Sequence, residues 1–166
     1  MKINPHKMNK KQLMKFFTGR CKHHHLYFEH PRCYINETNK PLKIGYFDIE
    51  TGGLKANTDL MLCYSIKTMD KDEILHCSIR KKDIHTEIFD RNLIKQLIKD
   101  LLEYDVIMTY YGTGFDLPFA RTRALSWGLK FPPFGVVKHK DVYYMARAKL
   151  CLTSKSLDTV CELLEI

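Results

Sequence analysis

The sequence predicts an α/β fold, because three consecutive strands are followed by strands that alternate with helices. Residues 60–67 and 73–80 are short apolar runs rich in strand-forming residues, and the polar turn at 69–72 separates them as in an antiparallel meander. Apolar residues then recur at helical spacing through residues 89–102, which leaves an outer face that carries lysines. With 166 residues, of which 45% are hydrophobic, the chain can bury one main core and add a small appendage.

The elements of the main domain follow one another with clear boundaries. Residues 43–54, KIGYFDIETGGL, contain an apolar run that predicts a buried first strand, and a Thr-Gly-Gly turn ends it. A helix at 116–127 ends at Gly128. The remaining elements are a fourth strand at 106–109 beside the first, a rigid FPPF turn at 131–134, a fifth strand at 135–139, and helices at 141–150 and 156–164, the last capped by Ser156.

Residues 1–40 are predicted to form a separate basic N-terminal arm that carries a knuckle of cysteine and histidine. Residues 1–20 are rich in lysine, and an apolar pattern within them predicts one or two helical turns whose apolar face docks elsewhere. A frayed, solvated terminus is the alternative. Residues 36–41 are polar and form a linker, so the main domain is predicted to span 41–166. The apolar positions of the arm are Leu13, Met14, Phe16 and Phe17.

Two cysteines and four histidines gather within residues 21–34, CKHHHLYFEHPRCY, a density far above chance. Zinc takes four tetrahedral thiolate or imidazole ligands, so a pair from each end of this segment could hold one structural ion. A histidine loop that touches phosphates and an appended histidine tag are the alternatives. The predicted ligands are Cys21, His23, His30 and Cys33, and His24 or His25 could replace His23.

The composition favours a nucleic-acid partner and contains no pattern of a membrane protein. The 27 Lys and Arg against 19 Asp and Glu give a net charge of +8, which suits a polyanion. No apolar run approaches the length of a membrane span, and no apolar core of a signal peptide follows the basic start. A cytoplasmic protein of a microbe or a virus-infected cell is therefore expected. Four of the six cysteines lie in apolar segments and are interpreted as buried thiols, whereas Cys21 and Cys33 stand in a different context.

Two carboxylates, Asp48 and Glu50, end the first predicted strand. Strand side chains alternate between the two faces of a sheet, so both carboxylates point the same way. Side by side they repel each other, unless a divalent cation or a shared proton offsets the repulsion. Taken alone, an Asp-x-Glu at a strand end is more simply explained as a solvated acidic turn, but a second motif downstream favours a metal site.

The second motif lies in residues 106–123, VIMTYYGTGFDLPFARTR, where a short strand and a glycine loop lead to Asp116 at the start of a helix. Asp is favoured at a helix N-terminus and Pro118 suits the first turn, so Asp116 could act as a cap, as a metal ligand, or as both. A strand-end Asp-x-Glu combined with a Gly-x-Gly-Phe-Asp helix start is far more specific than either part alone.

The two motifs resemble those of the DEDD exonucleases of the ribonuclease-H-like superfamily, especially the proofreading domains of family B DNA polymerases and their stand-alone microbial and viral relatives. FDIETGGL resembles their first exonuclease motif and TYYGTGFDLPFARTRA resembles the second, and the resemblance extends over residues 43–166. It implies a ribonuclease-H-like mixed five-stranded sheet flanked by helices. It also implies that Asp48, Glu50 and Asp116 are catalytic residues that bind two Mg²⁺ or Mn²⁺ ions.

The chain departs from the family pattern in two places. Tyr111 stands where many relatives have Asn, which concerns a substrate contact and not the metal ligands. The fourth acid of the family, in a Tyr-x-x-x-Asp or His-x-x-x-Asp motif, has no convincing copy before Ile166, and Asp141 occupies a position where relatives carry a structural Asp. The exonuclease domain is therefore expected to be truncated at its C-terminus, and no residue is assigned as the general base.

The predicted function is that of a nuclease, a hydrolase that removes nucleotides from the 3′ end of single-stranded DNA or RNA and has a polymerase or replication protein as a candidate partner. Arg121 and Arg123 are candidates for phosphate contact, although a solvated surface role is the simpler explanation for at least one. A catalytically incomplete nucleic-acid-binding or regulatory module is the alternative, and a structural interaction domain is a third. Base stacking or core packing is expected of Tyr110, Tyr111 and Phe115.

Overall fold

The chain divides into two compact units, Met1–Pro41 and Leu42–Ile166. The division falls at the end of the predicted linker at 36–41, of which residues 39–41 lie outside the described residues. Each unit has its own hydrophobic core, so each is described by itself. The computed structural model describes residues 8–38, 42–69, 71–133 and 135–166.

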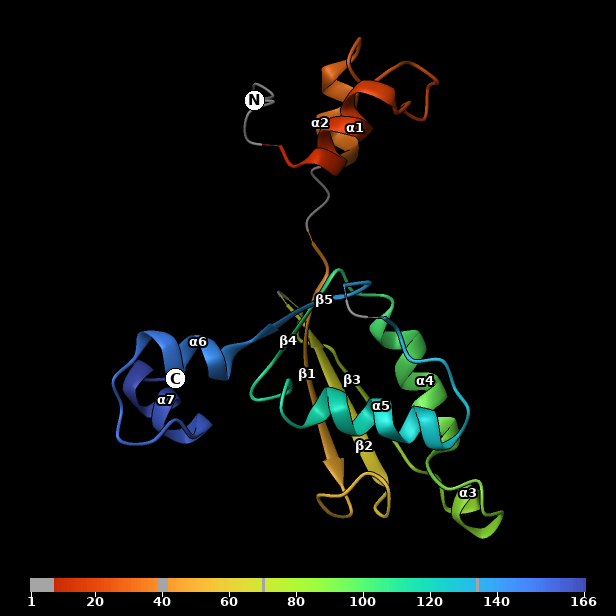
Figure 1. Ribbon diagram of the computed structural model, residues 1–166, viewed down its shortest axis with the longest axis vertical. Helices are drawn as coiled ribbons and strands as arrows, with labels where there is room; N and C mark the ends of the chain where they lie inside the picture. Colours follow the sequence, from red (N-terminus) through yellow and green to blue (C-terminus); the bar gives the residue numbers. More distant parts are fainter. Residues whose placement is uncertain (1–7, 39–41, 70, 134) are drawn as a thin grey trace. The chain divides into compact units, whose positions relative to one another are not determined.

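The larger unit is built on one mixed five-stranded sheet, as the resemblance implied (Figure 1). Its strands are β1 (Ile44–Thr51), β2 (Met61–Thr68), β3 (Ile74–Ser78), β4 (Val106–Thr109) and β5 (Lys138–Asp141). Their order in the sheet is β3-β2-β1-β4-β5. The β1–β2 and β2–β3 pairs are antiparallel, and the β1–β4 and β4–β5 pairs are parallel. The predicted contact between the first and fourth strands is therefore confirmed.

Strand β5 begins three residues later than the sequence predicted. Gly135 has a φ of +87°, which lies outside the strand region, and the ladder with β4 starts only where Lys138 pairs with Val106. The shift places Asp141 at the end of β5, where its side chain caps the helix that follows. Two of the predicted turns, at 69–72 and 131–134, contain residues 70 and 134, which lie outside the described residues.

Five helices are described in the larger unit, and one of them, the short α3, was not predicted. They are α3 (Lys81–His85), α4 (Arg91–Leu101), α5 (Asp116–Ser126), α6 (Val142–Lys149) and α7 (Leu157–Leu164). Helices α4 and α5 lie against one face of the sheet, whereas α6 and α7 follow β5 on the other side (Figure 1). The core between the sheet and α4 and α5 includes Phe47, Ile49, Ile66, Ile94, Leu97 and Phe119.

The side chains of β1 alternate between the core and the opposite face of the sheet. Phe47 and Ile49 are buried, whereas Asp48 and Glu50 are exposed. This alternation follows from the two-residue period of a strand. A bulge between Glu50 and Thr51 then interrupts the pairing with β2. The prediction that the two carboxylates share one face is confirmed.

The smaller unit consists of two helices and a cluster of aromatic residues. Helix α1 (Lys10–Thr18) begins with a capping box between Asn9 and Gln12, so the predicted helical turns are confirmed. Helix α2 (Pro31–Thr38) includes residues 36–38, which were predicted as linker. The helix continues through them because Tyr34 packs in the core and holds α2 in place. The buried residues of this core are Phe16, Cys21, Tyr27 and Tyr34.

The six cysteines are free thiols, and the four that the sequence indicated as buried are not buried. Cys151 is exposed, and Cys63, Cys77 and Cys161 are half-buried, so the prediction of four buried thiols is wrong. The segments that contain them are apolar in sequence, but strand β3 and the region after α6 lie at the surface of the unit.

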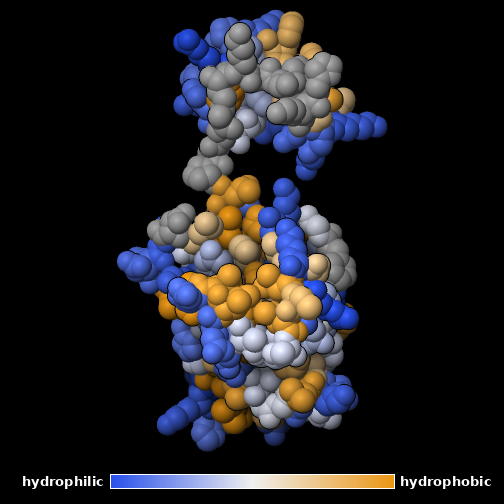
Figure 2. All heavy atoms as spheres, turned by 90° about the vertical axis from the view of Figure 1, so that its left-hand side faces the viewer, coloured by the Kyte–Doolittle hydropathy of each residue, from blue (hydrophilic) through white to orange (hydrophobic). Residues whose placement is uncertain are grey.

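Figure 2 shows that hydrophobic side chains gather on the side of the larger unit where α6 and α7 lie. The exposed apolar side chains of α6 and α7 are Tyr144, Met145, Leu157, Leu163 and Leu164.

Among the helices of the described residues, none combines the length and the apolar character needed to cross a membrane.

Candidate active site

The candidate site lies where β1 ends beside the start of α5. The parallel pairing of β1 with β4 extends to Tyr46, so the strand continues beyond its last partner in β4. The backbone N–H of Ile49 in this continuation donates to Asp116 Oδ1 at 3.2 Å. A carboxylate oxygen thus takes the place of a strand carbonyl and joins the first residue of α5 to β1.

Asp116 is only 3% exposed, although it lies at a helix terminus. The N-cap position of α5 belongs to Phe115, and no side chain caps the helix there, so the predicted capping role of Asp116 is wrong. Its carboxylate is turned toward β1 instead, because the N–H of Ile49 is a buried donor that needs an acceptor. The helix N-terminus favours the negative charge at this position.

Asp48 and Asp116 interact with each other, and the pKa values of both carboxyl groups are raised. Burial raises the pKa of Asp116 to about 6, and the negative charge of Asp48 adds to the shift. Loss of hydration raises the pKa of Asp48, the charge of Glu50 adds to this effect, and a hydrogen bond with Asp116 opposes it. Two carboxyl groups in this state favour a shared proton or a divalent cation.

Glu50 lies two residues further along β1 on the same face and is exposed. The three predicted ligands therefore do not form a compact set. Within the part of the chain that the structure describes, a group with three potential ligand atoms within 4.8 Å of one another is found only among cysteine and histidine residues of the smaller unit. The structure brings Asp48 and Asp116 together and leaves Glu50 further out.

Asp141 holds the loop that leads into α5. Its Oδ1 accepts hydrogen bonds from the N–H groups of Tyr111 at 2.9 Å and Tyr143 at 3.1 Å, and its Oδ2 accepts one from Thr113 at 2.8 Å. Burial alone would raise the pKa of Asp141, but these hydrogen bonds outweigh it and hold the pKa below its ordinary value. The bonds agree with the structural role that the resemblance implied for this residue.

The loop between β4 and α5 is compact. Tyr111 has a φ of +64°, and its carbonyl accepts hydrogen bonds from Gly114 at 2.9 Å and Phe115 at 3.1 Å. Gly114 has no room for a side chain, because a Cβ would overlap the ring of Tyr111. The N–H of Gly112 donates to the hydroxyl of Thr109 at 3.1 Å. These contacts set the point at which α5 begins.

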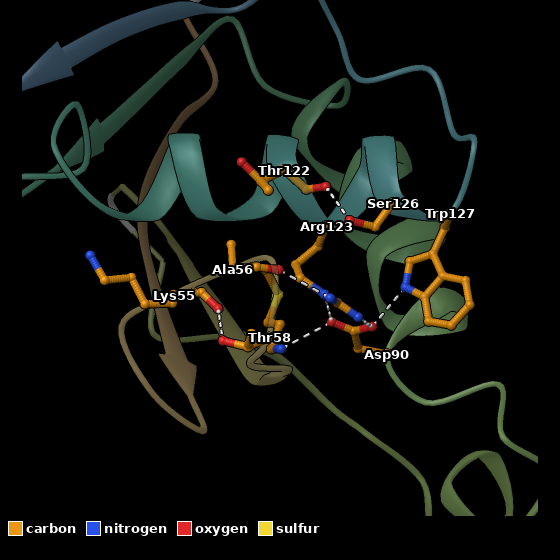
Figure 3. Close-up of polar contacts among 9 residues, drawn as sticks. Lys55, Ala56, Thr58, Asp90, Thr122, Arg123, Ser126 and Trp127 are labelled. Atoms are coloured by element: carbon orange, nitrogen blue, oxygen red, sulfur yellow. Dashed lines mark hydrogen bonds and ion pairs between the residues drawn. The ribbon is translucent and has the colours of Figure 1, made fainter.

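A buried network fixes α5 near its other end (Figure 3). Asp90 is fully buried and accepts two hydrogen bonds from Arg123 and one from the indole N–H of Trp127, each at 2.7 Å. The N–H of Met61 donates to the same carboxylate, and Arg123 also donates to the carbonyl of Ala56, both at 3.0 Å. Burial alone would raise the pKa of Asp90, but the hydrogen bonds hold it below its ordinary value. The network ties α5 to α4 and to the β1–β2 connection.

The prediction of a phosphate contact is wrong for Arg123, because its guanidinium is buried and bonded to Asp90. The guanidinium of Arg121 lies over the ring of Phe131 at 5.4 Å from its centroid. Sequence reasoning missed Asp90 and Trp127. The available signals were the single tryptophan of the chain and an Asp placed directly before an amphipathic helix.

A cleft of about 440 Å³ opens beside Asp48, on the face of the sheet away from α4 and α5. Tyr46, Ser65 and Lys67 line it from the sheet, and Leu157 lines it from α7. Its walls are apolar and aromatic, with a lysine and a carboxylate among them. Such a cleft has the chemistry to accept one nucleotide next to the acidic pair.

The three aromatic residues near the site have different surroundings. Phe115 is half-buried and packs against the core. Tyr110 lines the cleft, and its hydroxyl donates to the carbonyl of Lys155 at 2.6 Å. Tyr111 is 45% exposed, and its ring contacts that of Tyr143 edge-on at 4.9 Å.

Three of the four predicted zinc ligands converge in the smaller unit. The Sγ of Cys21 lies 3.9 Å from Nδ1 of His23, and the ligand atoms of these two residues and of Cys33 all lie within 4.8 Å of one another. A tight turn positions the first two, since the N–H of His24 donates to the carbonyl of Cys21 at 2.8 Å. Cys33 lies in the first turn of α2. Burial raises the pKa of Cys33, and a hydrogen bond with Cys21 adds to the shift.

The fourth predicted ligand, His30, is not part of this group. It lies three residues before Cys33, a spacing that places both side chains on one side of a helix start. Its ring stacks instead on that of His25, with centroids 4.2 Å apart. The ring of His25 lies 6.3 Å from that of His23.

The fold and the acidic pair define the class of this protein. The chain belongs to the RNase H superfamily, because the sequence pattern of that superfamily matches residues 45–166. The match begins at the start of β1 and includes both carboxylates of the pair.

This chain is similar to two archaeal polymerases, one in sequence and one in fold. A protein described as DNA polymerase from Methanocaldococcus jannaschii is 34% identical over a region that covers 43% of this chain and 6% of that protein. The structure of the family B DNA polymerase from the hyperthermophilic archaeon Pyrobaculum calidifontis has a TM-score of 0.62 and 22% sequence identity, and the match covers 75% of this chain and 18% of that chain. The second likeness concerns the fold. The chain spans only a small part of the length of either polymerase.

Proposed function

We propose that this chain is a metal-dependent 3′–5′ exonuclease of the DEDD type, which hydrolyses phosphodiester bonds of single-stranded DNA or RNA. The observation that carries the proposal is the meeting of Asp48 and Asp116, whose pKa values are both raised. Acidic groups held together against their repulsion are typical of metal-binding and catalytic sites. The net charge of +8 and the similarity to archaeal DNA polymerases support a nucleic-acid substrate.

The residues of the site fit Mg²⁺ or Mn²⁺. Hard divalent cations prefer carboxylate oxygens, and Asp48 and Asp116 would hold them, with Glu50 on the same face completing the set. When bound, such ions supply an activated water and stabilise the leaving oxygen. The bond from Ile49 fixes the orientation of the Asp116 carboxylate. The 3′-terminal nucleotide would occupy the cleft beside Asp48, with Lys67 near its phosphate.

Incubation with end-labelled single-stranded DNA and RNA in Mn²⁺ or Mg²⁺ tests this proposal. We expect stepwise shortening from the 3′ end, and a loss of rate of about 100-fold or more in Asp48→Ala and in Asp116→Asn, because each removes a charge from the metal site. The matched control is Asp72→Asn, which removes an exposed carboxylate from the β2–β3 connection. Absence of shortening by the unmodified chain with either ion, or equal rates in all variants, would contradict the proposal.

One observation favours a second function, the binding or regulation of nucleic acid without hydrolysis. The resemblance calls for a fourth acid, and the carboxylate of Asp141 is already engaged by three backbone N–H groups. The set would then consist of three carboxylates, which bind a divalent ion more weakly than four. In this case the chain retains single strands in the presence of Mn²⁺ without shortening them.

We also propose that the smaller unit holds one structural zinc ion through Cys21, His23, His30 and Cys33. The convergence of three of these residues supports the site. His30 is the proposed fourth ligand, because it directly precedes α2 and its carbonyl accepts the N–H of Cys33 at 2.9 Å, and its stacking partner His25 is the alternative. Zinc binding would remove the thiol proton of Cys33, whose pKa is raised in the metal-free state.

Metal analysis of protein purified without chelators tests the zinc site. We expect one zinc ion per chain, no zinc in Cys33→Ser, and unchanged zinc in the control Cys151→Ser, whose thiol is exposed in the larger unit. Loss of zinc in His30→Ala but not in His25→Ala would assign the fourth ligand. Protein that contains no zinc, or Cys33→Ser that retains it, would contradict the proposal.

The proposed partners are single-stranded nucleic acid and a polymerase or other replication protein, in the cytoplasm of a microbe or a virus-infected cell. The four cysteines outside the proposed zinc site are free thiols, which is usual in a reducing compartment. Fractionation of cells that express the labelled chain would test the location.

A further inference from the structure

The smaller unit carries two aromatic rings that its own core does not enclose. Phe17 in α1 is 52% exposed and Phe28, which follows the knuckle turn, is 53% exposed. Their ring centroids lie 6.4 Å apart, and the ring planes differ by 34°. The neighbouring Phe16 is buried and packs edge-on against Tyr34, with centroids 5.0 Å apart. The core therefore takes Phe16 and leaves the other two rings at the surface.

The exposed rings continue along one side of α1. Lys10, Met14 and Phe17 follow one another at intervals of four and three residues, which places them on the same side of a helix. All three are exposed. One side of α1 thus runs from a cation at its start to an aromatic ring near its end, beside the ring of Phe28.

The smaller unit is basic as well as aromatic. Residues 8–38 contain six Lys and Arg against two Glu. One of the two, Glu37, is engaged within the unit, because its carboxylate accepts the hydroxyl of Tyr27 at 2.7 Å and the N–H of Lys22 at 3.2 Å. In Figure 2 blue side chains predominate among the coloured residues of the N-terminal unit, with some orange side chains between them.

This combination identifies the occupant of the surface by its chemistry. Aromatic residues are enriched at the centre of protein–protein interfaces but lysine is depleted there, so the lysines around this pair favour a polyanion over a protein partner. Single-stranded nucleic acid is complementary to this surface, because its bases stack on aromatic rings and its phosphates pair with lysine. Stacking accepts any base, because every base has a flat face.

We propose that Phe17 and Phe28 form a stacking platform for single-stranded nucleic acid, in which exposed lysines of α1 hold the phosphates. The platform belongs to the smaller unit and shares no residue with the acidic pair of the larger unit. It would retain a strand whether or not the chain hydrolyses it.

Fluorescence anisotropy with labelled oligo-dT and oligo-U tests the platform. The full chain is used without Mg²⁺ or Mn²⁺, so that no strand is hydrolysed, and without a chelator. We expect Phe17→Leu and Phe28→Leu each to weaken binding by about 5-fold or more, because leucine keeps the apolar volume but not the stacking. Phe17→Trp and Phe28→Trp should bind at least as tightly as the unmodified chain. The two oligonucleotides show whether DNA or RNA is preferred.

Leu163→Ala is the matched control, because Leu163 is 52% exposed in the larger unit and should leave binding unchanged. Lys10→Glu tests the cationic side of α1 and should weaken binding and reduce its salt dependence. Circular dichroism checks that each variant is folded. Unchanged binding in both leucine variants would overturn the platform. So would a self-associated chain that Phe17→Leu dissociates, because the surface would then be a protein interface.

The result is separate from the test of exonuclease activity. Binding that depends on Phe17 and Phe28, found in a chain that does not shorten strands, would support the platform and contradict hydrolysis. Shortening of strands by the unmodified chain, together with normal binding by the two leucine variants, would support hydrolysis and contradict the platform.

Discussion

At the scale of single residues, Asp116 serves both the fold and the candidate chemistry. Its carboxylate accepts the buried N–H of Ile49, which stabilises the junction of β1 and α5. Its negative charge lies against that of Asp48, which destabilises the same junction when no cation is bound. The two effects depend differently on pH, so they can be separated.

We expect Asp116→Asn to raise the stability of the metal-free chain at neutral pH. The folded-state pKa of Asp116 is raised from 3.8 to about 6, so its contribution to stability is fully present below 3.8 and is lost as the pH rises through about 6. The amide can still accept the N–H of Ile49 but carries no charge. The free energy of unfolding should therefore increase on the order of 2 kcal/mol at about pH 7.5, and the gain should vanish near pH 4.

Thermal unfolding across this pH range, without divalent ions, measures the difference between the two proteins. Mn²⁺ should then stabilise the unmodified chain and leave the variant unchanged. A difference that is the same at every pH would show that repulsion between the carboxylates is not its cause.

At the scale of elements, α5 is held at both ends by contacts with other parts of the chain. Its first residue bonds to β1, and Arg123 and Trp127 near its end bond to Asp90 before α4. The helix cannot shift along its axis without breaking one of these contacts. The Asp90 network therefore positions the acidic pair from the far end of α5, although it touches neither carboxylate.

We expect Asp90→Asn to destabilise the larger unit by about 3 to 5 kcal/mol, because it leaves the buried guanidinium of Arg123 without its counter-charge. The control is Asp72→Asn, which removes an exposed carboxylate from the β2–β3 connection. Surface substitutions of this kind usually change the free energy of unfolding by about 0.5 kcal/mol or less. Urea unfolding followed by fluorescence of Trp127 measures both losses, and losses of equal size would contradict the distinction.

At the scale of the whole molecule, the two units have separate cores and are expected to respond separately to zinc. A closed zinc site in a small unit supplies much of the stability that its limited core cannot. The only tryptophan of the chain, Trp127, belongs to the larger unit, so its fluorescence reports on that unit alone. Hydrogen exchange of α1 and α2 reports on the smaller one.

We expect a chelator to increase hydrogen exchange throughout α1 and α2 and to leave the Trp127 unfolding transition unchanged. Cys33→Ser should have the same effect without a chelator, because it removes a proposed ligand. A chelator that shifts the fluorescence transition as well would show that the two units depend on each other.

The sequence predicted the helices and strands correctly wherever a local pattern of residues determines the element. Leu93, Ile94 and Leu97 recur at helical spacing and form the buried side of α4. Local patterns were insufficient at residues 36–38, where polar residues continue α2 because Tyr34 anchors that helix in the core. They were also insufficient at β5, which begins where Lys138 pairs with Val106 at the start of its partner β4.

The sequence by itself determined that Asp48 and Glu50 share a face, because the two-residue period of a strand leaves no other arrangement. Only the tertiary structure decided the partners of Asp116, Arg123 and His30. The N–H of Ile49 lies 67 positions from Asp116 in the chain, and Asp90 lies 33 positions from Arg123. Whether such residues meet depends on how the helices pack on the sheet. A buried charge or a buried hydrogen-bond donor pairs with whichever partner the packing brings within reach.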